Sequence, residues 1–398
     1  MEKNREEKIN ETLTRGVDEI IDATSLAKKL KSGKRLRVKL GIDPTSPNIH
    51  LGRSIPLLKL RDFQELGHRV VLIIGDFTGI IGDTSDKESE RPMLDAKTIK
   101  HNMKNYVAQA GKILDMRKCE VKYNSKWLKK LRFLDIANMA NLFSLHEFES
   151  RENISNRLEA GKRVTLRELM YPIMQGYDSV AVRADVELGG TDQRFNLLAG
   201  RDIQKYYNQT PQDIMTNPLI EGLDGRKMSS SWGNTINLMD SADEMFGKTM
   251  SLKDEFIIKY FMFVTRVPME KISQIKQMQN PRDQKVMLAK EIVTMYHGSK
   301  EADRAEDHFN KVFRDKEAPE DMPVFETANA TYPILDLLFD SKLAESKNDA
   351  RRVVEGGGVT IEIKNEKFKI QNWREEIKIE DDMVVQFGKR KFVKIKLK

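Results

Sequence analysis

The sequence predicts an α/β fold: a Rossmann-like parallel-sheet domain with a helical insertion, then an α-helical domain and a small α+β domain. Two observations support this prediction. A strand pattern at 38–42, an amphipathic helix at 54–66 and an apolar strand at 70–76 form a βαβ unit, which is typical of a parallel sheet. Near the other end, the alternating stretch 359–363 follows three glycines and indicates a strand of a separate domain.

The length of the chain requires several hydrophobic cores, because 398 residues exceed what one core supports. We expect residues 1–236 to form the Rossmann-like domain, with the insertion at about 85–160. Residues 237–325 show helical periodicity, and residues 326–398 would form the small C-terminal domain. The acid-rich, proline-containing stretch 314–321 marks the boundary between these two domains.

The N-terminal segment has the pattern of one charged amphipathic helix that runs to about residue 34. Its apolar stripe would be formed by Ile9, Leu13, Val17, Ile20 and Ile21. The sequence Lys31-Ser32-Gly33-Lys34 is expected to end it. We therefore expect a surface helix that packs on the Rossmann-like domain.

The remaining elements follow from the same periodicity rules. Within the first domain we expect a strand at 119–121, helices at 131–142, 154–158 and 166–180, and a strand at 182–188. That last strand would deliver Gly189, Gly190 and Asp192 to the edge of the sheet. In the C-terminal domain, a helix pair is expected at 335–338 and 347–355.

The composition argues against secretion and against a membrane anchor. Cys119 is the single cysteine, so the chain can form neither an internal disulfide nor a cysteine zinc cluster. The N-terminus resembles no signal peptide, and the longest apolar run, 70–74, is too short to cross a bilayer. We expect a cytoplasmic protein. Its net charge of +7 and its basic end at 388–398 are compatible with a polyanionic partner.

Two short segments have the composition of a phosphate site. His50 and Gly52 fall where the helix after the first strand begins, and a helix N-terminus presents free N–H groups to an anion. The segment 225–231 offers Lys227 and several small hydroxyls on a glycine-flanked loop, which suits a mobile clamp over a leaving pyrophosphate. Together they predict nucleotide-dependent activation chemistry.

The two segments, in this order, resemble the HIGH and KMSKS signatures of the class I aminoacyl-tRNA synthetases. The residues around them resemble the tyrosyl-tRNA synthetases of bacterial type in particular. These flanking motifs are Gly41-Ile42-Asp43-Pro44-Thr45, the stretch 75–83, the stretch 171–178 and Gly189-Gly190-Thr191-Asp192-Gln193. The resemblance runs from about residue 35 to the C-terminus.

The resemblance implies a tyrosine–tRNA ligase. Its substrates would be L-tyrosine, ATP accompanied by Mg²⁺, and tRNA(Tyr), with no metal held by the protein itself. The insertion would carry a homodimer interface, the helical domain would recognise the anticodon, and the C-terminal domain would bind RNA. No membrane partner is implied.

The resemblance also assigns roles to residues. His50, Arg53, Lys227 and Ser230 would be catalytic, although the family usually has a second histidine at the position of Arg53 and a lysine at that of Ser230. The ATP site would comprise Gly41, Asp43, Gly52, Gly190, Asp192, Lys227 and Met228. The tyrosine site would comprise Lys39, Thr78, Asp83, Tyr171, Gln175, Asp178 and Gln193, with Asp178 on the phenolic hydroxyl. RNA would contact Lys347, Arg351, Arg352, Lys389 and Arg390.

An alternative hypothesis is a synthetase-derived RNA-binding protein that has lost catalysis. Arg53 favours it, whereas His50, Asp178 and Lys227 argue against it because they are intact. A narrower alternative concerns the substrate. Tryptophanyl enzymes share the fold, but they have no use for Asp178 as an acceptor for a phenol.

Overall fold

The computed structural model describes residues 2–85, 93–313, 322–363, 366–388 and 391–397. The chain forms two compact units, Met1–Gly298 and Ser299–Lys398. Each is described by itself. The predicted boundary at 314–321 and the predicted RNA contacts Lys389 and Arg390 lie outside the described residues. None of the helices in the described ranges is long and apolar enough to span a membrane.

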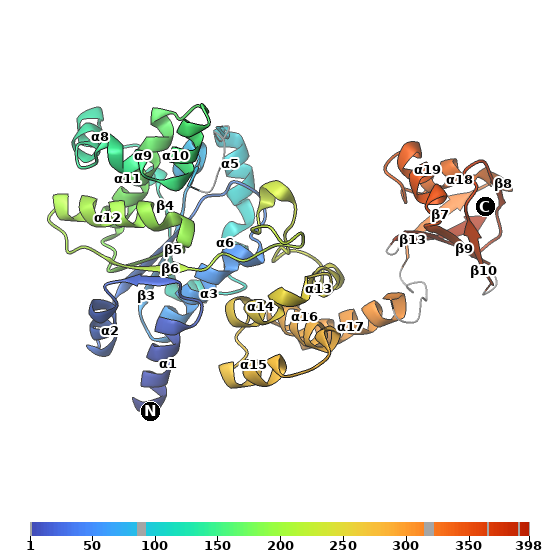
Figure 1. Cartoon of the computed structure of the whole chain (residues 1–398), viewed down its shortest axis with the longest axis horizontal. Helices are drawn as coiled ribbons and strands as arrows, with labels where there is room; N and C mark the ends of the chain where they lie inside the picture. Colours follow the sequence, from blue (N-terminus) through green and yellow to red (C-terminus); the bar gives the residue numbers. More distant parts are fainter. Residues whose placement is uncertain (1, 86–92, 314–321, 364–365, 389–390, 398) are drawn as a thin grey trace. The chain divides into compact units, whose positions relative to one another are not determined.

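A six-stranded sheet forms the centre of the first unit, in the order β1-β6-β5-β2-β3-β4 (Figure 1). Its strands are β1 (Glu19–Ile21), β2 (Arg37–Ile42), β3 (Arg69–Ile74), β4 (Cys119–Tyr123), β5 (Val186–Gly190) and β6 (Asp213–Asn217). The edge strand β1 pairs antiparallel with β6, and the other neighbours are parallel. The predicted parallel sheet is confirmed.

Helices cover both faces of this sheet. Helix α3 (Leu51–Glu65) contacts β2, β3 and β5, and it buries Leu57, Leu60 and Phe63. Helix α11 (Leu166–Val182) packs on α12 (Arg194–Tyr206), which contacts β5 and β6 and lies with α11 on the other face (Figure 1). The crossovers β2–α3–β3 and β5–α12–β6 leave the sheet in opposite directions, so a crevice opens at the carboxyl ends of β2 and β5.

The prediction of a single N-terminal helix is wrong. The segment forms helix α1 (Glu2–Thr14), strand β1 and helix α2 (Ala23–Lys31). Gly16 has a φ of 61°, which a helix does not accommodate, and Asp22 caps α2 by accepting a hydrogen bond of 3.0 Å from the Ser25 amide. Ile20 and Ile21 therefore lie in a strand paired with β6 and not on a helical stripe.

The strand predicted at 182–188 begins later than expected. Helix α11 continues to Val182, and Arg183, with a φ of 51°, ends it in the left-handed conformation. Strand β5 then covers Val186–Gly190, which still brings Gly189 and Gly190 to the edge of the sheet.

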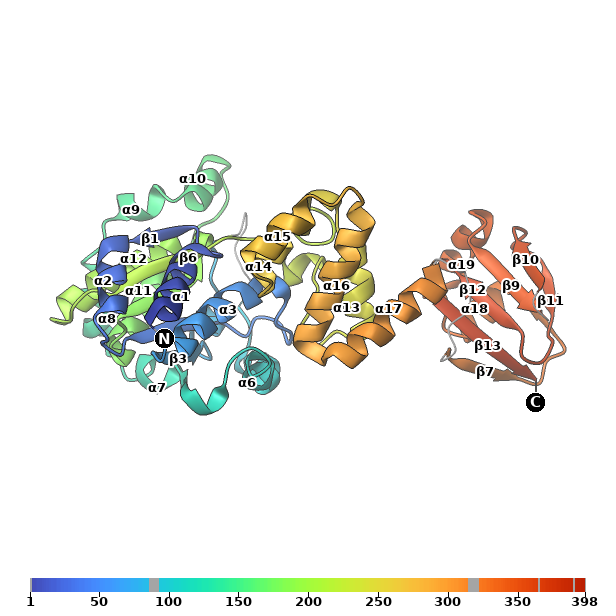
Figure 2. The same ribbon diagram turned by 90° about the horizontal axis from the view of Figure 1, so that it is seen from below.

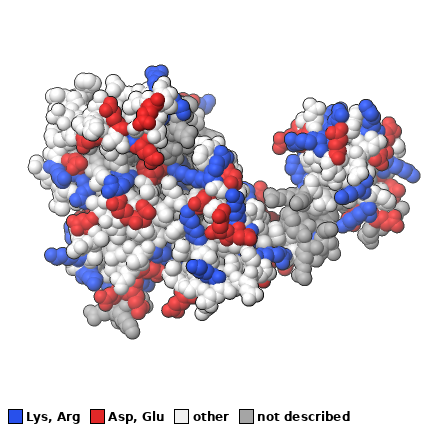
Figure 3. All heavy atoms as spheres, in the orientation of Figure 1, with Lys and Arg blue, Asp and Glu red and all other residues white. Residues whose placement is uncertain are grey.

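The insertion contains short helices, and its predicted strand joins the main sheet as β4. Helix α4 (Thr78–Ile81) precedes the insertion, whose helices are α5 (Ala96–Asn102), α6 (Tyr106–Ala110), α7 (Ser125–Leu128), α8 (Phe133–Ala140), α9 (Leu145–Glu149) and α10 (Glu152–Glu159). Several large apolar side chains of this region are exposed, namely Phe133, Leu134, Leu145 and Leu158, and so is Leu166 at the start of α11. Figure 3 shows an area poor in charge over α8.

The segment after the sheet is helical, as predicted. It comprises α13 (Ala242–Met250), α14 (Ile257–Val264), α15 (Met269–Lys276) and α16 (Pro281–His297), grouped together in Figure 2. Helices α13 and α14 both pack on α16, and α14 also contacts α3. These helices belong to the first compact unit, and their separation as a domain stays a prediction.

The second unit contains α17 (Ser299–Phe313) and, beyond the gap at 314–321, a five-stranded sheet in the order β10-β9-β12-β13-β7. The sheet strands are β7 (Val324–Thr327), β9 (Val359–Ile363), β10 (Glu366–Ile370), β12 (Val384–Phe387) and β13 (Lys391–Leu397), and β8 (Thr331–Pro333) pairs separately with β11 (Glu376–Lys378). The predicted helix pair is present as α18 (Ile334–Asp340) and α19 (Lys347–Glu355). These two helices pack on one face of the sheet over a buried apolar core (Figure 2).

Candidate active site

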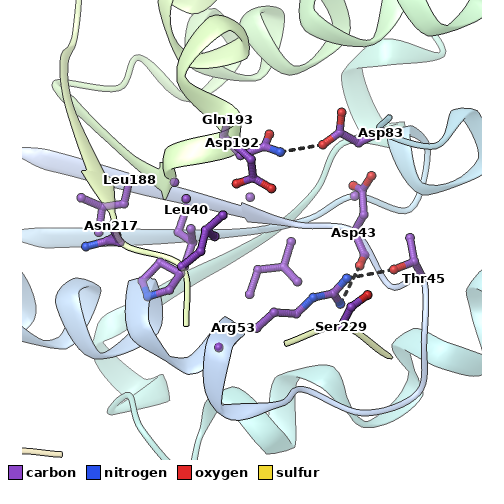
Figure 4. A pocket seen from close by; sticks show the side chains of 18 of the residues that line it. Leu40, Asp43, Thr45, Arg53, Asp83, Leu188, Asp192, Gln193, Asn217 and Ser229 are labelled. Atoms are coloured by element: carbon purple, nitrogen blue, oxygen red, sulfur yellow. Dashed lines mark hydrogen bonds between the residues drawn. The ribbon is translucent and has the colours of Figure 1, made fainter. Parts of the chain in front are cut away.

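A cavity of about 350 Å³ lies at the carboxyl ends of β2 and β5. It brings together almost all of the predicted ATP-binding, tyrosine-binding and catalytic residues. The predicted residues that line it are Gly41, Asp43, His50, Gly52, Arg53, Thr78, Asp83, Tyr171, Gln175, Asp178, Gly190, Asp192, Gln193, Lys227, Met228 and Ser230. Figure 4 shows several of them around one space.

Asp178, on helix α11, forms a buried acceptor at one end of the cavity. Its carboxylate accepts hydrogen bonds from Trp127 Nε1 (2.7 Å) and Asn124 Nδ2 (3.2 Å), and the residue is 4% exposed. Burial raises the pKa of Asp178 to about 7, although the Lys39 charge and the two hydrogen bonds act in the other direction. Sequence reasoning missed Trp127 and Asn124, which lie about fifty positions from Asp178 along the chain.

Asp43 connects the residues predicted for tyrosine with those predicted for ATP. One carboxylate oxygen accepts from the Thr78 hydroxyl (2.7 Å) and the other from the Tyr171 hydroxyl (2.8 Å). Burial, with the neighbouring carboxylates, raises the pKa of Tyr171 well above its usual value. Gly75 allows this arrangement, because a Cβ there would lie 1.9 Å from Asp43 Oδ1.

Asp83 and Gln193 face each other across the cavity. Gln193 Nε2 donates to Asp83 Oδ2 over 2.6 Å (Figure 4), and the Ser85 hydroxyl donates to Asp83 Oδ1 over 2.5 Å. Gln175 Nε2 donates to Glu187 (3.3 Å), while Gln175 Oε1 is buried and has no hydrogen-bond partner among the described residues. The cavity therefore offers acceptors for a substrate ammonium group.

His50 caps helix α3 and is held as a neutral imidazole. Its Nδ1 accepts a hydrogen bond of 3.3 Å from the Arg53 amide. Burial, and then the charges of Arg53 and Lys227, lower its pKa to about 3. A neutral imidazole whose Nδ1 accepts carries its proton on Nε2. His50 can thus donate one hydrogen bond to an anion and adds no charge.

The Arg53 guanidinium is fixed by three neighbours. It donates to Tyr106 Oη (3.0 Å), to Thr45 Oγ1 (2.9 Å) and to the Asp43 carbonyl (3.4 Å), two of which appear in Figure 4. Tyr106 is completely buried. Sequence reasoning missed both Tyr106 and Thr45 as neighbours of Arg53. The arrangement places a fixed cation in the cavity wall.

The loop that contains Lys227 closes the opposite side of the cavity. Lys227 Nζ forms an ion pair of 3.0 Å with Asp192, and the sulfur of Met228 accepts from the Gly52 amide (3.3 Å). The Ser230 hydroxyl lies 3.1 Å from that of Ser46. The loop therefore contacts the segment in front of α3.

The same loop is braced from within. Asn234 donates to Asp224 (2.7 Å) and to the Lys227 carbonyl (3.1 Å), and the Arg226 guanidinium stacks 4.7 Å from the centre of the Trp232 ring. Trp232 is 47% exposed. These contacts shape the turn that presents Lys227.

Among the residues predicted to bind tyrosine, Lys39 alone is missing from the described cavity lining. It is 1% exposed and lies behind the wall, where it forms an ion pair of 3.0 Å with the equally buried Glu187. Its strand neighbours explain this placement. Lys39 and Glu187 are register partners on β2 and β5. Lys39 precedes Gly41 on its strand, and Glu187 precedes Gly189 and Gly190 on the other, and these glycines reach the cavity.

The predicted RNA-binding residues of the described ranges belong to helix α19 of the second unit and are not among the residues that line the cavity. Each forms an exposed ion pair: Lys347 with Asp336 (2.5 Å), Arg351 with Glu355 (2.9 Å) and Arg352 with Asp349 (2.7 Å). Arg351 and Arg374 also stack on Trp373, at 4.3 and 4.2 Å from the centre of its ring. On the face in Figure 3, both signs of charge are mixed over this unit.

Comparison with known proteins identifies the family of the chain. Residues 31–314 match the family described as tRNA synthetases class I (W and Y), and residues 315–395 match the C-terminal domain of tyrosine–tRNA ligases. The curated tyrosine–tRNA ligase of Thermotoga maritima is 44% identical over 389 residues, which cover 96% of each chain. That of Carboxydothermus hydrogenoformans is 43% identical over 403 residues, or 97% of each chain. The chain belongs to the tyrosyl-tRNA synthetases.

Solved structures of tyrosyl-tRNA synthetases share the fold at lower identity. A C-terminally truncated mitochondrial enzyme from Aspergillus nidulans is 22% identical, with a TM-score of 0.63, and the match covers 79% of this chain and all of that one. An Archaeoglobus fulgidus enzyme complexed with L-tyrosine is 21% identical, with a TM-score of 0.61, and the match covers 76% and 99% of the two chains. The predicted fold and enzyme class of this tyrosyl-tRNA synthetase are confirmed.

Proposed function

We propose that the cavity activates L-tyrosine with ATP and that the product tyrosyl-adenylate then passes its tyrosine to a ribose hydroxyl of the 3′-terminal adenosine of tRNA(Tyr), which releases AMP. In the first step a carboxylate oxygen of tyrosine forms a bond to the α-phosphorus, and the bond from that phosphorus to pyrophosphate breaks. The observation that carries this proposal is that one cavity holds a buried carboxylate, Asp178, and two phosphate-side groups, His50 and Lys227.

The Asp178 end suits the phenolic hydroxyl of tyrosine. Trp127 and Asn124 donate to the carboxylate and orient it, so an ionised Asp178 can accept a further hydrogen bond from a substrate hydroxyl. Phenylalanine would leave this buried carboxylate without that further hydrogen bond and without water to replace it, which is costly. The substrate ammonium would lie among Tyr171, Asp83 and Gln175, of which Gln175 offers a buried oxygen without a partner in the described structure.

The other end suits the phosphates. His50 would donate from Nε2 to the α-phosphate as its charge grows in the transition state, and Lys227 would neutralise the leaving pyrophosphate. The ATP phosphates have to compete with Asp192 for Lys227, because these two residues lie 3.0 Å apart. Arg53 would supply a fixed positive charge nearby.

Mg²⁺ would arrive with ATP and neutralise its phosphate oxygens. In the described ranges, no group of three or more His, Cys, Asp and Glu side chains is arranged to hold a metal ion. That the protein itself holds no metal stays a prediction. The glycines Gly41 and Gly190, together with Asp192, lie where they could border the adenosine.

We further propose a homodimer formed through the insertion. Within the insertion, Phe133 is 88%, Leu134 is 65% and Leu145 is 61% exposed, and Leu166, at the start of α11, is 78% exposed. Exposed large apolar side chains in this number mark an interaction surface. The expected observation is twice the monomer mass in solution, lost on Phe133→Asp.

The second unit would contact RNA through helix α19. Its three basic residues Lys347, Arg351 and Arg352 are solvent-exposed and form ion pairs on the surface, which are weak enough to exchange a carboxylate for a phosphate. Such contacts would position the RNA without reading its sequence.

The test of the main proposal is tyrosine-dependent exchange of labelled pyrophosphate into ATP by the purified protein, without tRNA. We expect exchange with tyrosine and none with phenylalanine or tryptophan. Exchange with none of the three, from folded protein, would favour the RNA-binding hypothesis. Exchange with tryptophan alone would overturn the assignment of Asp178.

A further inference from the structure

A fully buried polar cluster lies directly behind the tyrosine end of the cavity. Its centre is the ion pair of Lys39 and Glu187, each 1% exposed, at 3.0 Å. Glu187 Oε2 also accepts from the Ser179 hydroxyl (3.0 Å) and from Gln212 Nε2. A buried ion pair is weak evidence for stability, because desolvation offsets the attraction. A contribution to stability therefore does not explain why this pair lies here.

The pair contacts the cavity through Gln175. Glu187 Oε1 accepts from Gln175 Nε2 (3.3 Å), and Lys39 Nζ donates to the Gln175 carbonyl (3.2 Å). A carboxylate only accepts hydrogen bonds, so it fixes which end of the Gln175 amide faces it. Gln175 Oε1 must then point away from Glu187, and this is the buried oxygen that has no partner among the described residues.

The pair also acts on Asp178, one helical turn after Gln175. The charged groups that face Asp178 are Lys39 on β2 and Glu187 on β5. Trp127 and Asn124 donate to it, and Tyr171 lies on the same helix. Lys39 favours the carboxylate form of Asp178 and Glu187 disfavours it. The two charges have opposite signs. Removing Lys39 alone should therefore raise the pKa of Asp178, and removing Glu187 alone should lower it.

We propose that Lys39 and Glu187 are positioning residues for tyrosine selection: Glu187 orients the Gln175 amide toward the substrate ammonium, and the pair together balances the charge that Asp178 experiences. Lys39 thus serves the tyrosine site without touching tyrosine. This inference rests on the proposed contact between Asp178 and the substrate hydroxyl.

The test compares Lys39→Met, Glu187→Gln and the double variant with the unaltered enzyme. Tyrosine KM and kcat are measured by pyrophosphate exchange between about pH 5 and 9. Glu187→Gln should raise the tyrosine KM about tenfold, the value of one hydrogen bond to a charged group, and leave kcat at saturating tyrosine nearly unchanged. The ATP KM should not change in any variant.

The pH profile separates positioning from mere structural support. Tyrosine affinity should fall as the pH drops through the Asp178 transition. Lys39→Met should move that midpoint up by about one pH unit, and Glu187→Gln should move it down. The double variant, which leaves no unpaired buried charge, should restore the midpoint but keep the raised KM.

Lys59→Met is the matched control. Lys59 is also a buried lysine, 2% exposed and paired with Asp62 at 3.0 Å, but it does not line the cavity. If the Lys39 and Glu187 variants behave like Lys59→Met, with no opposite shift of the midpoint, the cluster is structural and the inference is wrong. Loss of discrimination against phenylalanine in Lys39→Met without a midpoint shift would also overturn it, because that result indicates direct contact with tyrosine.

Two further measurements distinguish a folding defect and a wrong tyrosine site from a failure of this inference. Thermal unfolding shows whether each variant folds, and if a single variant does not, the raised KM of the double variant still tests the role of Glu187. Asp178→Asn tests the underlying assignment. Normal selectivity in Asp178→Asn would refute the proposed tyrosine site itself, whereas an impaired Asp178→Asn beside silent Lys39 and Glu187 variants would refute only the present inference.

Discussion

The cavity of the first unit and helix α19 of the second unit use charge in opposite ways. At one end of the cavity and directly behind it, charges are buried: Asp178 is 4% exposed, and Lys39 and Glu187 are 1% exposed. On α19, the Arg352 side chain is 80% exposed and pairs with Asp349 in solvent. Each buried charge interacts through a low dielectric and is individually important, whereas exposed charges are screened and act only in number. The effect of single substitutions should therefore differ by orders of magnitude between the two regions.

The largest effect is expected at Asp178. A site built to bind a substrate hydroxyl rejects the analogue without it by about 10⁴–10⁵, a value known from tyrosyl-tRNA synthetases themselves. Asp178→Ala should remove most of this preference for tyrosine over phenylalanine and leave ATP binding intact. The ratio of kcat/KM for the two amino acids in pyrophosphate exchange measures it. Unchanged discrimination would contradict the pocket assignment.

His50 comes next, because the role proposed for it is confined to the transition state. His50→Ala should lower kcat for adenylate formation by about 10²–10³ and change the tyrosine KM little. His50→Asn, which can still donate one hydrogen bond, should recover part of the rate. Rapid-quench measurement of adenylate formation shows the step directly. A change in KM alone would place His50 in ground-state binding instead.

The pH dependence should reveal the buried carboxylate. The pKa of Asp178 is raised to about 7, so the carboxylate becomes protonated as the pH falls below neutrality. The protonated form no longer accepts the proposed hydrogen bond from the phenolic hydroxyl as a carboxylate does. Tyrosine affinity should fall by up to about tenfold per pH unit below that value. His50, with a pKa lowered to about 3, should contribute nothing in this range. Binding measured by calorimetry tests this, and a flat profile above pH 5 would contradict it.

The smallest effects are expected on α19. Arg352→Ala should leave amino-acid activation unchanged, alter stability by no more than about 0.5 kcal/mol, and weaken tRNA binding only a few-fold. The slope of the logarithm of tRNA affinity against the logarithm of salt concentration should decrease by about the amount that one phosphate contact contributes. If Arg352→Ala reduced tRNA affinity by as large a factor as Asp178→Ala reduces the preference for tyrosine, the proposed difference between the two regions would be wrong.

The features that the sequence predicted correctly are local ones. Strand β2 and helix α3 follow from short hydrophobic periods, and His50 could be placed at the start of α3 because a signature and a helix boundary coincide there. Such information is contained within a few neighbouring residues.

The features that were missed depend on pairing between distant segments. Strand β1 exists because Glu19 pairs with Thr216, almost two hundred positions away. Lys39 lies behind the cavity because its register partner on β5 is Glu187. Tyr106 and Trp127 contact Arg53 and Asp178 only after the insertion has folded back onto the sheet. No window of sequence contains these contacts.

The three tryptophans of the chain can serve as intrinsic fluorescence probes. Trp127 donates to Asp178 in the proposed tyrosine site, Trp232 stacks on Arg226 in the Lys227 loop, and Trp373 contacts two arginines of the second unit, Arg351 and Arg374. Indole fluorescence responds to nearby charge and to solvent. Variants that keep one indole each would therefore report substrate capture, loop closure and RNA contact as three separate signals, without an attached dye.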